Sequence, residues 1–251
     1  MKYTEKEINE LIKVYRESLK PNWNLLHTEQ TPRGKALEKP SIYKTYQEGE
    51  VIELNQDIAN LSNRTLDDII MSRRSIRKYS KDLISFDELS YLLKLTCDIR
   101  QIGNGFALGV VPTGGARNTL ETYFYANNVE GLNKGLYHYQ KDTKNIRLIK
   151  KDVDPESVND STLGQLRDTG IVVFWSTIPY RSEYRYIFTA HKMIAMEAGH
   201  ASQNLYLAAE SIDCGMVAIA AYDQSKVDKL LELDGEDEFV VYVATVGKKI
   251  K

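Results

Sequence analysis

A basic stretch at residues 71–80, MSRRSIRKYS, holds three arginines and a lysine between Arg73 and Lys78. It ends a short predicted helix, where cations interact favourably with the helix dipole, so a solvated helix end is one interpretation. Arg73, Ser75 and Arg77 alternate, however, and an extended backbone would point all three side chains the same way. Two guanidiniums and a hydroxyl on one face suit a phosphate and a second polar group of the same ligand. The stretch alone leaves both interpretations open.

A glycine pair stands in the segment VPTGGARNTLETYF at 111–124. Gly114 and Gly115 follow Pro112 and Thr113, and glycines permit positive φ and close backbone approach to a flat ligand or an anion. The segment matches neither GxGxxG nor a Walker A loop, so Rossmann and P-loop nucleotide sites have no support. Taken alone, the pair is also compatible with a plain turn.

Polar residues also stand on a predicted long helix in the segment 178–204, namely Glu197, His200, Gln203 and Asn204. Their small neighbours make buried, hydrogen-bonded side chains the ordinary interpretation. The four histidines are scattered without an HxxxH or HExxH pair, so no metal site is predicted. There is no GxSxG elbow, which leaves a serine-hydrolase triad unsupported.

The composition is that of a soluble globular protein, with 42% hydrophobic and 27% charged residues. The formal net charge of −2 gives no reason to expect nucleic acid or an anionic membrane as a partner, so any anion site must be local. Sixteen tyrosines against six phenylalanines indicate half-buried surfaces, as at pockets and subunit contacts.

The cellular compartment is predicted from cysteine usage and from the first residues. Cys97 and Cys214 lack CxxC spacing and sit in apolar surroundings, which favours buried, reduced thiols. The N-terminal sequence lacks the apolar core of a signal peptide, and no run approaches the ~20 apolar residues of a membrane span. We therefore expect a cytoplasmic protein.

The N-terminal part is predicted as a helix followed by an extended arm. Thr4 and Glu7 form a capping box that starts an amphipathic helix, and 21–56 show little periodicity and hold three of the six prolines. We expect 1–60 to form this helix and arm and 61–251 to form the main domain. The helix carries one apolar stripe, made of Ile8, Leu11, Ile12, Tyr15 and Leu19.

The main domain mixes helix and strand signals and is predicted as α+β with a central, mixed, mostly antiparallel sheet flanked by helices. Helices are predicted to start near Thr65, Ser85 and Asp223. One long core helix is expected over 182–212. The apolar run 170–178 is typical of a central strand covered on both faces, and further strands are expected at 120–129, 136–140, 145–149, 216–222 and 239–247.

In this order, the motifs resemble those of the nitroreductase superfamily of flavin enzymes, and most closely its SagB-type branch, the azoline dehydrogenases of thiazole- and oxazole-modified peptide biosynthesis. The resemblance spans about 65–248, and the segment before it is also similar to the leader region of the branch. It is carried by SRRSIRKYS, PTGGARNTLETYF, VEGLNKGLYHY, EYRYIFTAHKMIAMEAGHASQNLYLAAESIDCGMVAIAAYD and VYVATVGK.

The resemblance implies a nitroreductase-like fold and a homodimer with two FMN sites at its subunit interface. It matches Arg73, Ser75 and Arg77 to the residues that hold the phosphate, the ribityl chain and the N1/O2 edge of the ring. Arg74 is counted with this cofactor-binding set, although its side chain and that of Lys78 are expected to face solvent or a partner carboxylate. Along the ring, the partner subunit would place Pro112, Thr113, Gly114, Gly115 and Arg117. A strand holding Val217, Ala218 and Ile219 would face the other side of the ring, and Lys248 would add to the phosphate grip.

The same resemblance makes Tyr180 the candidate catalytic residue. The branch often carries a Lys-Tyr pair as base and proton relay, and here Pro179 stands in place of the lysine. Oxidation of an azoline needs a base, which Tyr180 could supply if Arg181 or Arg185 lowered its pKa. Three functions stay open: an azoline dehydrogenase acting on a modified peptide, an NAD(P)H-dependent nitro or quinone reductase, and a non-catalytic flavin-binding subunit of a peptide-modifying complex.

Overall fold

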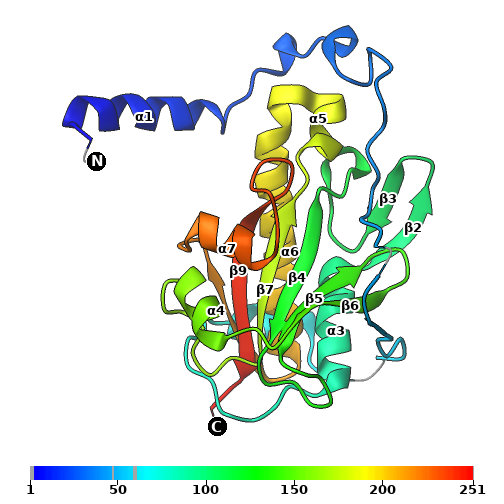
Figure 1. The fold of residues 1–251 in the computed structure, drawn as a ribbon, viewed down its shortest axis with the longest axis vertical. Helices are drawn as coiled ribbons and strands as arrows, with labels where there is room; N and C mark the ends of the chain where they lie inside the picture. Colours follow the sequence, from blue (N-terminus) through cyan, green and yellow to red (C-terminus); the bar gives the residue numbers. More distant parts are fainter. Residues whose placement is uncertain (1–2, 47, 59–60, 251) are drawn as a thin grey trace.

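The computed structural model describes residues 3–46, 48–58 and 61–250. Its first helix, α1 (Glu5–Glu17), begins at the predicted capping box, where the Glu7 amide donates to Thr4 Oγ1 and the Thr4 amide donates to the Glu7 carboxylate. No residue of α1 is buried, and the helix extends away from the rest of the molecule (Figure 1). The predicted apolar stripe is therefore exposed in the single chain, most of all at Tyr15 and Leu19.

The arm that follows α1 has little regular structure, as predicted. Its Arg33 amide donates to the Tyr184 carbonyl at 3.0 Å, which fastens the arm to α5 (Tyr180–Tyr186). The predicted boundary at residue 60 lies outside the described residues. The short elements of the arm are η1 (Trp23–Leu25), η2 (Thr28–Gln30) and the edge strand β1 (Val51–Ile52).

A seven-stranded sheet forms the centre of the domain, in the order β1-β6-β5-β4-β7-β9-β8. Every pair of neighbouring strands in it is antiparallel. All seven residues of β7 are buried, and β7 lies between β4 and β9, which confirms the predicted central strand. The strands are β4 (Leu120–Ala126), β5 (Gly135–Gln140), β6 (Asn145–Lys151), β7 (Ile171–Thr177), β8 (Cys214–Ile219) and β9 (Phe239–Lys248).

In the main domain, side-chain caps start four helices, three of them at the predicted positions. Thr65, Ser85 and Asp223 cap α2 (Leu66–Ser72), α3 (Phe86–Cys97) and α7 (Gln224–Leu230), while Asp154 caps α4 (Pro155–Ser161). The sequence analysis missed α4 and a separate hairpin of β2 (Ile99–Gly103) and β3 (Phe106–Gly109).

The predicted long helix is interrupted. It consists of α5, a 3-10 turn η4 (Ile187–Thr189) and α6 (Ala190–Ser211). Ile187, at the break, has a φ of 38°, a conformation that a β-branched residue rarely adopts. The Tyr186 carbonyl accepts a hydrogen bond from the Thr189 hydroxyl at 2.6 Å, so the break leaves this group satisfied.

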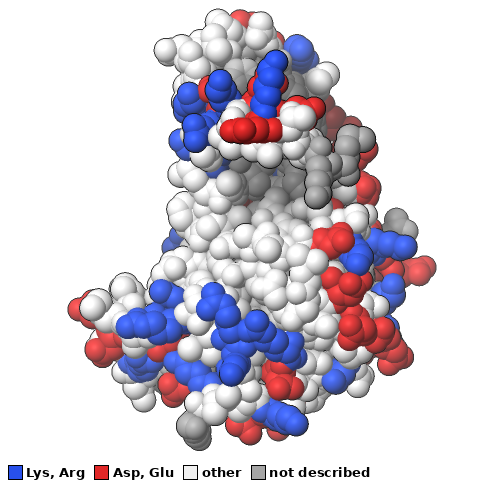
Figure 2. Space-filling view, turned by 90° about the vertical axis from the view of Figure 1, so that its left-hand side faces the viewer, with Lys and Arg blue, Asp and Glu red and all other residues white. Residues whose placement is uncertain are grey.

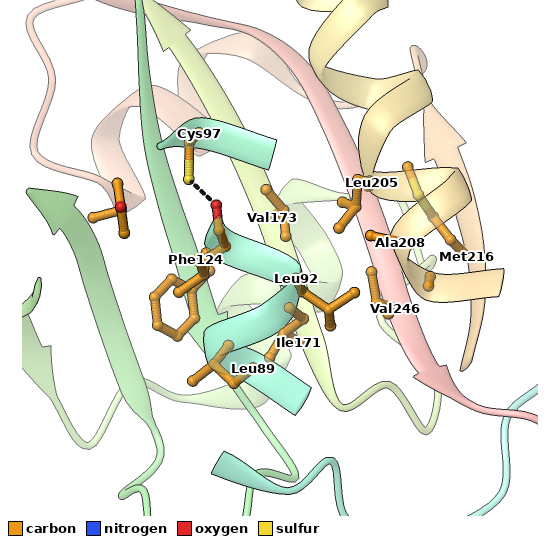
Figure 3. Close-up of a cluster of buried hydrophobic side chains, with 14 of the residues drawn as sticks. Leu89, Leu92, Cys97, Phe124, Ile171, Val173, Leu205, Ala208, Met216 and Val246 are labelled. Carbon is orange, nitrogen blue, oxygen red and sulfur yellow. Dashed lines mark hydrogen bonds between the residues drawn. The ribbon is translucent and has the colours of Figure 1, made fainter. Parts of the chain in front are cut away.

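Two apolar clusters hold the helices on opposite faces of the sheet. On one face, α3 and α6 place Leu89, Leu92 and Leu205 against β4, β7 and β9 (Figure 3). On the other face, α4 and α7 contribute Val158 and Val227. The fold is thus three-layered and α+β, as predicted. Within the described residues, no helix is both long and apolar enough to cross a membrane.

The cysteines are free and buried, as predicted, and Cys97 Sγ donates to the Leu93 carbonyl at 2.9 Å. The expectation for the tyrosines is wrong in part. Tyr123, Tyr125, Tyr137 and Tyr139 are almost completely buried in β4 and β5, instead of lining pockets or subunit contacts. These strands are covered on both faces, so their aromatic side chains fill the core.

Candidate functional site

The basic stretch leaves α2 in an extended conformation. Ser75 forms an isolated parallel bridge with Met216 of β8, and the Ile76 amide donates to the Met216 carbonyl at 2.9 Å. Arg73 is half-buried at the C-terminus of α2, and Ser75 and Arg77 are exposed. The stretch therefore runs along the edge of the main sheet in extended form, as its alternating pattern predicts.

Tyr206 of α6 draws the first residues of this stretch together. The Arg73 guanidinium lies 4.8 Å from the centre of the Tyr206 ring, and Ser75 Oγ is 2.9 Å from the Tyr206 hydroxyl. The Ala218 amide donates to the same hydroxyl at 3.0 Å. The sequence analysis did not single out Tyr206, since nothing in its local pattern tells which helix residue will face a strand 12 positions away.

Further cations surround this point without acidic partners. Arg167 donates to the Arg77 carbonyl at 2.6 Å, and Arg74 turns back to donate to the carbonyls of Met71 and Arg73. Within the described part of the chain, none of the arginines at 73, 74, 77 and 167 has a carboxylate within 4.0 Å. Figure 2 shows Lys and Arg side chains gathered on the lower part of one face, below a broad uncharged surface.

Lys248 is directed elsewhere. Its ammonium is bound by the Glu88 carboxylate at the start of α3, and its carbonyl accepts from the Ser80 amide at 2.9 Å. Burial opposes the charge of Lys248, but the bond to Glu88 outweighs burial and raises its pKa. The structure therefore does not bring this predicted phosphate ligand to Arg73 as a free cation.

An apolar groove of about 730 Å³ lies between α6 and the edge of the sheet where β8 has ended and β9 begins. Its walls include the small side chains Ala195, Gly199 and Ala220. Ala195 and Gly199 lie on the same helix face as Tyr206, because helix positions four and seven apart lie on one side. The groove is therefore on the same face of α6 as Tyr206, which contacts Arg73.

The predicted strand residues Val217, Ala218 and Ile219 are not among those that line this groove. Val217 and Ile219 are buried, whereas Ala218 is half-buried beside Tyr206. Ala220, which comes directly after β8, lines the groove itself. The groove is thus lined by the residue that follows the predicted set, and the contact of Val217, Ala218 and Ile219 with a flavin stays a prediction.

The glycine pair packs against the start of α6. Gly115 has a φ of 62°, and a Cβ there would overlap the Tyr186 hydroxyl. A Cβ at Gly114 would overlap the end of the Met193 side chain. Gly115 therefore requires glycine because of its positive φ, whereas the flexible end of Met193 can move away from a Cβ at Gly114.

Glu197 of α6 anchors the loop before β4. Its carboxylate accepts from the hydroxyls of Thr113 at 2.7 Å and Thr119 at 2.9 Å, and from the Leu120 amide at 3.4 Å. His200 Nδ1 lies 3.2 Å from the Pro112 carbonyl. The interpretation of Glu197 and His200 as hydrogen-bonded helix residues is confirmed, although His200 is exposed.

Replacing Thr113 by valine should lower the free energy of unfolding by about 1–2 kcal/mol, because the buried Glu197 loses a hydrogen-bond donor. Urea unfolding of the two proteins measures the difference. Thr143→Val, in an exposed turn, is the matched control and should change little. Equal losses in both variants would contradict the anchoring role of Glu197.

The loop and the basic cluster contact opposite faces of α6. Glu197, which holds the loop, and Tyr206, which holds Arg73 and Ser75, are nine positions apart. At about 100° per residue, nine positions amount to two and a half turns, so the two side chains point in opposite directions. A second cavity, of about 490 Å³, lies on the loop side and is lined by Thr113, Gly114 and His200.

Tyr180 begins α5 and is 38% exposed. Its hydroxyl donates to the Glu38 carbonyl of the arm at 3.4 Å. Arg181 points into the core, where Nη1 lies 2.6 Å from Glu121 Oε1. Arg185 lies over the ring of Tyr186. The structure thus engages both arginines elsewhere than at the Tyr180 hydroxyl.

A model of the nitroreductase family matches residues 70–248. The chain belongs to the nitroreductase family. It is an oxidoreductase of this family, whose members generally use FMN. The Methanocaldococcus jannaschii protein MJ1384, which is assigned by name to the nitroreductases, is 26% identical over 208 residues, covering 81% of this chain and 100% of its own length.

Solved structures show the same fold at lower identity. A nitroreductase-type protein from Anabaena variabilis has a TM-score of 0.68 at 23% identity. The match covers 87% of this chain and 46% of that chain, so this chain spans about half the length of that protein. One from Ralstonia eutropha has a TM-score of 0.67 at 18% identity, and the match covers 83% of this chain and 94% of that chain. A chain of the E. coli microcin synthetase McbBCD, solved with truncated pro-MccB17 bound, has a TM-score of 0.62 at 18% identity. This match covers 99% of this chain and 96% of that chain.

The residues of this nitroreductase-family chain suit an FMN. Among the described residues, arginines without acidic partners lie on the α6 face that also carries an open groove, whose small side chains leave room for a flat, apolar ring. Near Arg73, the hydrogen-bonded hydroxyls of Ser75 and Tyr206 add polar groups that suit the ribityl chain of an FMN. Among the described residues, no group of three or more His, Cys, Asp or Glu side chains is placed to hold a metal ion.

Proposed function

We propose that this nitroreductase-family protein binds FMN with its phosphate at Arg73, Ser75 and Arg77 and its ring in the groove between α6 and β8. The observation that carries the proposal is the set of arginines without acidic partners, of which Arg73 lies over Tyr206 on the α6 face that also carries the groove. Phosphate is a dianion with oxygens that accept from guanidinium forks, so it would neutralise this cluster. Arg74 would act mainly through its charge, because its guanidinium already donates to two carbonyls.

We further propose that each site is completed by a second copy of the chain. The groove and the loop of Pro112, Thr113, Gly114 and Gly115 border two sides of α6, so one chain does not present both to the same ring. Between them, α6 exposes Ala195, Met196, Gly199 and Gln203. A partner packed on this stripe would bring its loop over the groove. Of the loop residues predicted to contact the flavin ring, Arg117 is the least suited, since its guanidinium is buried and donates to the Gly115 carbonyl.

The chain's contribution to catalysis would be binding and electrostatics. Bound FMN supplies two-electron chemistry by hydride transfer at N5. The strand backbone at Val217, Ala218 and Ile219 would hold one side of the ring, and an arginine at the N1/O2 edge would stabilise the negative charge of the reduced form. The apolar groove would limit access of water to the ring.

A modified peptide is our leading substrate proposal, with an azoline ring oxidised to an azole. It is supported by the likeness to the microcin synthetase chain, which covers 99% of this chain and so includes the N-terminal arm. The reaction removes a hydride and a carbon-bound proton, and Tyr180 is the candidate base. The non-catalytic flavin-binding subunit of such a complex would bind FMN without turning over.

One observation favours an NAD(P)H-dependent nitro or quinone reductase instead. The buried Pro179 replaces the lysine of the Lys-Tyr pair, and Tyr180 hydrogen-bonds to the arm while Arg181 is paired with Glu121. Arg181 and Arg185, the two candidates to assist Tyr180, therefore contact Glu121 and Tyr186 instead. A reductase has no need of such a base, because its substrate accepts the hydride.

Two assays on the FMN-loaded protein separate these functions. Loss of two hydrogens from an azoline peptide, measured by mass spectrometry, would support the dehydrogenase, and Tyr180→Phe should slow it at least about tenfold. Anaerobic bleaching of the flavin absorbance by NADH or NADPH would support the reductase. Tyr15→Phe, on the exposed helix α1, is the matched control. An unchanged rate in Tyr180→Phe would remove that residue from the mechanism, and failure of both assays would favour the non-catalytic subunit.

A further inference from the structure

A third cavity, which is polar and has a volume of about 290 Å³, lies away from the proposed flavin groove. It is enclosed by the arm, the turn of the β2–β3 hairpin, the glycine loop and α5. Its walls include Arg33, Lys39, Asn104, Arg117, Tyr184 and Arg185. Neither the fold nor the proposed flavin site explains why these cations converge.

The cavity carries four positive charges and no acidic side chain. None of Arg33, Lys39, Arg117 and Arg185 has a carboxylate within 4.0 Å among the residues at 3–46, 48–58 and 61–250. The six residues outside those ranges include no Asp or Glu. Like charges that converge without a counter-charge raise the free energy of the fold, so the arrangement calls for an anion.

Arg117 is the most deeply placed of the four cations. Only 5% of it is exposed, and its guanidinium donates to the carbonyls of Gly115, at 3.2 Å, and Gly105. Burial and the nearby charge of Arg185 lower its pKa, and Arg33 adds to this effect. Two neutral carbonyls do not compensate a buried guanidinium, whose remaining N–H groups are free to bind an oxyanion.

The walls hold these cations in place. Lys39 Nζ donates to Asn104 Oδ1 at 2.9 Å, and a Cβ at Gly105 would overlap the end of the Lys39 side chain. Gly105 also has a φ of 80°, so the hairpin turn is built to let the lysine cross it. Tyr184 donates to the Leu37 carbonyl at 3.3 Å and keeps the arm against α5.

We propose that this cavity binds the phosphate groups of an anionic ligand. Guanidinium forks match phosphate oxygens in pairs, and a phosphate or diphosphate neutralises four cations better than a single carboxylate does. The cavity volume exceeds the space that one phosphate needs, so we expect a diphosphate or a phosphate attached to a larger molecule. The ligand source is either a nicotinamide nucleotide or a phosphorylated substrate, which share this chemistry.

Isothermal titration calorimetry with inorganic pyrophosphate tests the site. The titration uses the Arg73→Gln/Arg77→Gln protein, so that the proposed flavin phosphate site does not contribute to binding. The result then does not depend on whether the flavin site is correctly proposed. We expect saturable binding that weakens with added salt. Arg33→Gln/Arg185→Gln should lower the affinity at least about tenfold, while Arg16→Gln, on the exposed α1, should leave it unchanged.

Competition identifies the source of the phosphate. Displacement of pyrophosphate by NADPH at least tenfold more effectively than by NADH would assign the nucleotide 2′-phosphate, and equal displacement would assign its diphosphate. No displacement by either, with pyrophosphate still bound, would assign a phosphorylated substrate. Absence of pyrophosphate binding, equal binding of citrate, or wild-type affinity in the Arg33→Gln/Arg185→Gln variant would overturn the proposal. If that variant does not fold, Arg33→Gln alone decides, because Arg33 is exposed.

Discussion

Replacing Arg73 and Arg77 together by glutamine is expected to lower the affinity for FMN at least about a hundredfold, since each charged hydrogen bond contributes ~1.5–3 kcal/mol. Arg73 is held over Tyr206, and the alternating pattern of the extended segment places Arg77 on the same side as Arg73. Neither has an acidic partner among the described residues, so the substitutions remove free charge and break no ion pair. Fluorescence titration of the apoprotein with FMN measures the effect.

Two controls separate this effect from damage to the fold. Lys81→Gln removes an exposed cation from the same part of the chain and should leave FMN affinity unchanged. Arg74→Gln should weaken binding less than the double substitution, because Arg74 donates to the Met71 and Arg73 carbonyls. FMN binding by the Arg73→Gln/Arg77→Gln protein at wild-type affinity would show that the phosphate lies elsewhere.

Glu121→Gln should lower the free energy of unfolding by about 3–5 kcal/mol, because it leaves buried cations without their counter-charge. Glu121 is completely buried in β4, and its carboxylate lies 2.6 Å from Arg181 Nη1, 3.1 Å from His138 Nε2 and 3.7 Å from Lys141 Nζ. Urea unfolding measures the loss. Glu130→Gln, at an exposed position after β4, is the control and should change little.

The same carboxylate predicts how stability depends on pH. Burial opposes its ionisation, but Lys141 and Arg181 outweigh burial and hold the pKa of Glu121 well below its usual value of 4.5. Below pH 4.5 the unfolded chain takes up a proton at this residue while the folded chain does not, so stability falls as the pH falls. The difference between wild type and Glu121→Gln should therefore shrink below pH 4.5. If the difference in the free energy of unfolding stayed constant below pH 4.5, the ionised Glu121 carboxylate would not be the source of the pH dependence.

Local signals in the sequence predicted most of the fold. The caps at Thr65, Ser85 and Asp223 depend on contacts within a few residues, and each starts a helix as expected. The apolar run of β7 marks a strand covered on both faces, whatever its neighbours are. The extended segment from Arg73 to Arg77 likewise follows from its own alternating pattern.

Contacts between distant segments account for what the sequence analysis missed. Lys248 is bound by Glu88, 160 positions away, and Tyr206 meets Ser75 across 131 positions. Helical periodicity continues through Ile187, so it gave no sign of the break between α5 and α6. Arg181, one of two candidates to assist Tyr180, is instead paired with Glu121 of β4. Partners so far apart in the chain leave no local pattern.

The most direct test of the account is native mass spectrometry of the protein after titration with FMN. We predict a species of two chains that carries two FMN molecules. The Arg73→Gln/Arg77→Gln protein should remain a dimer but lose the flavin, because these arginines are exposed or half-buried at the edge of the groove. Binding of one FMN by a single chain would contradict a site shared between two copies, and absence of FMN from every species would contradict the flavin site altogether.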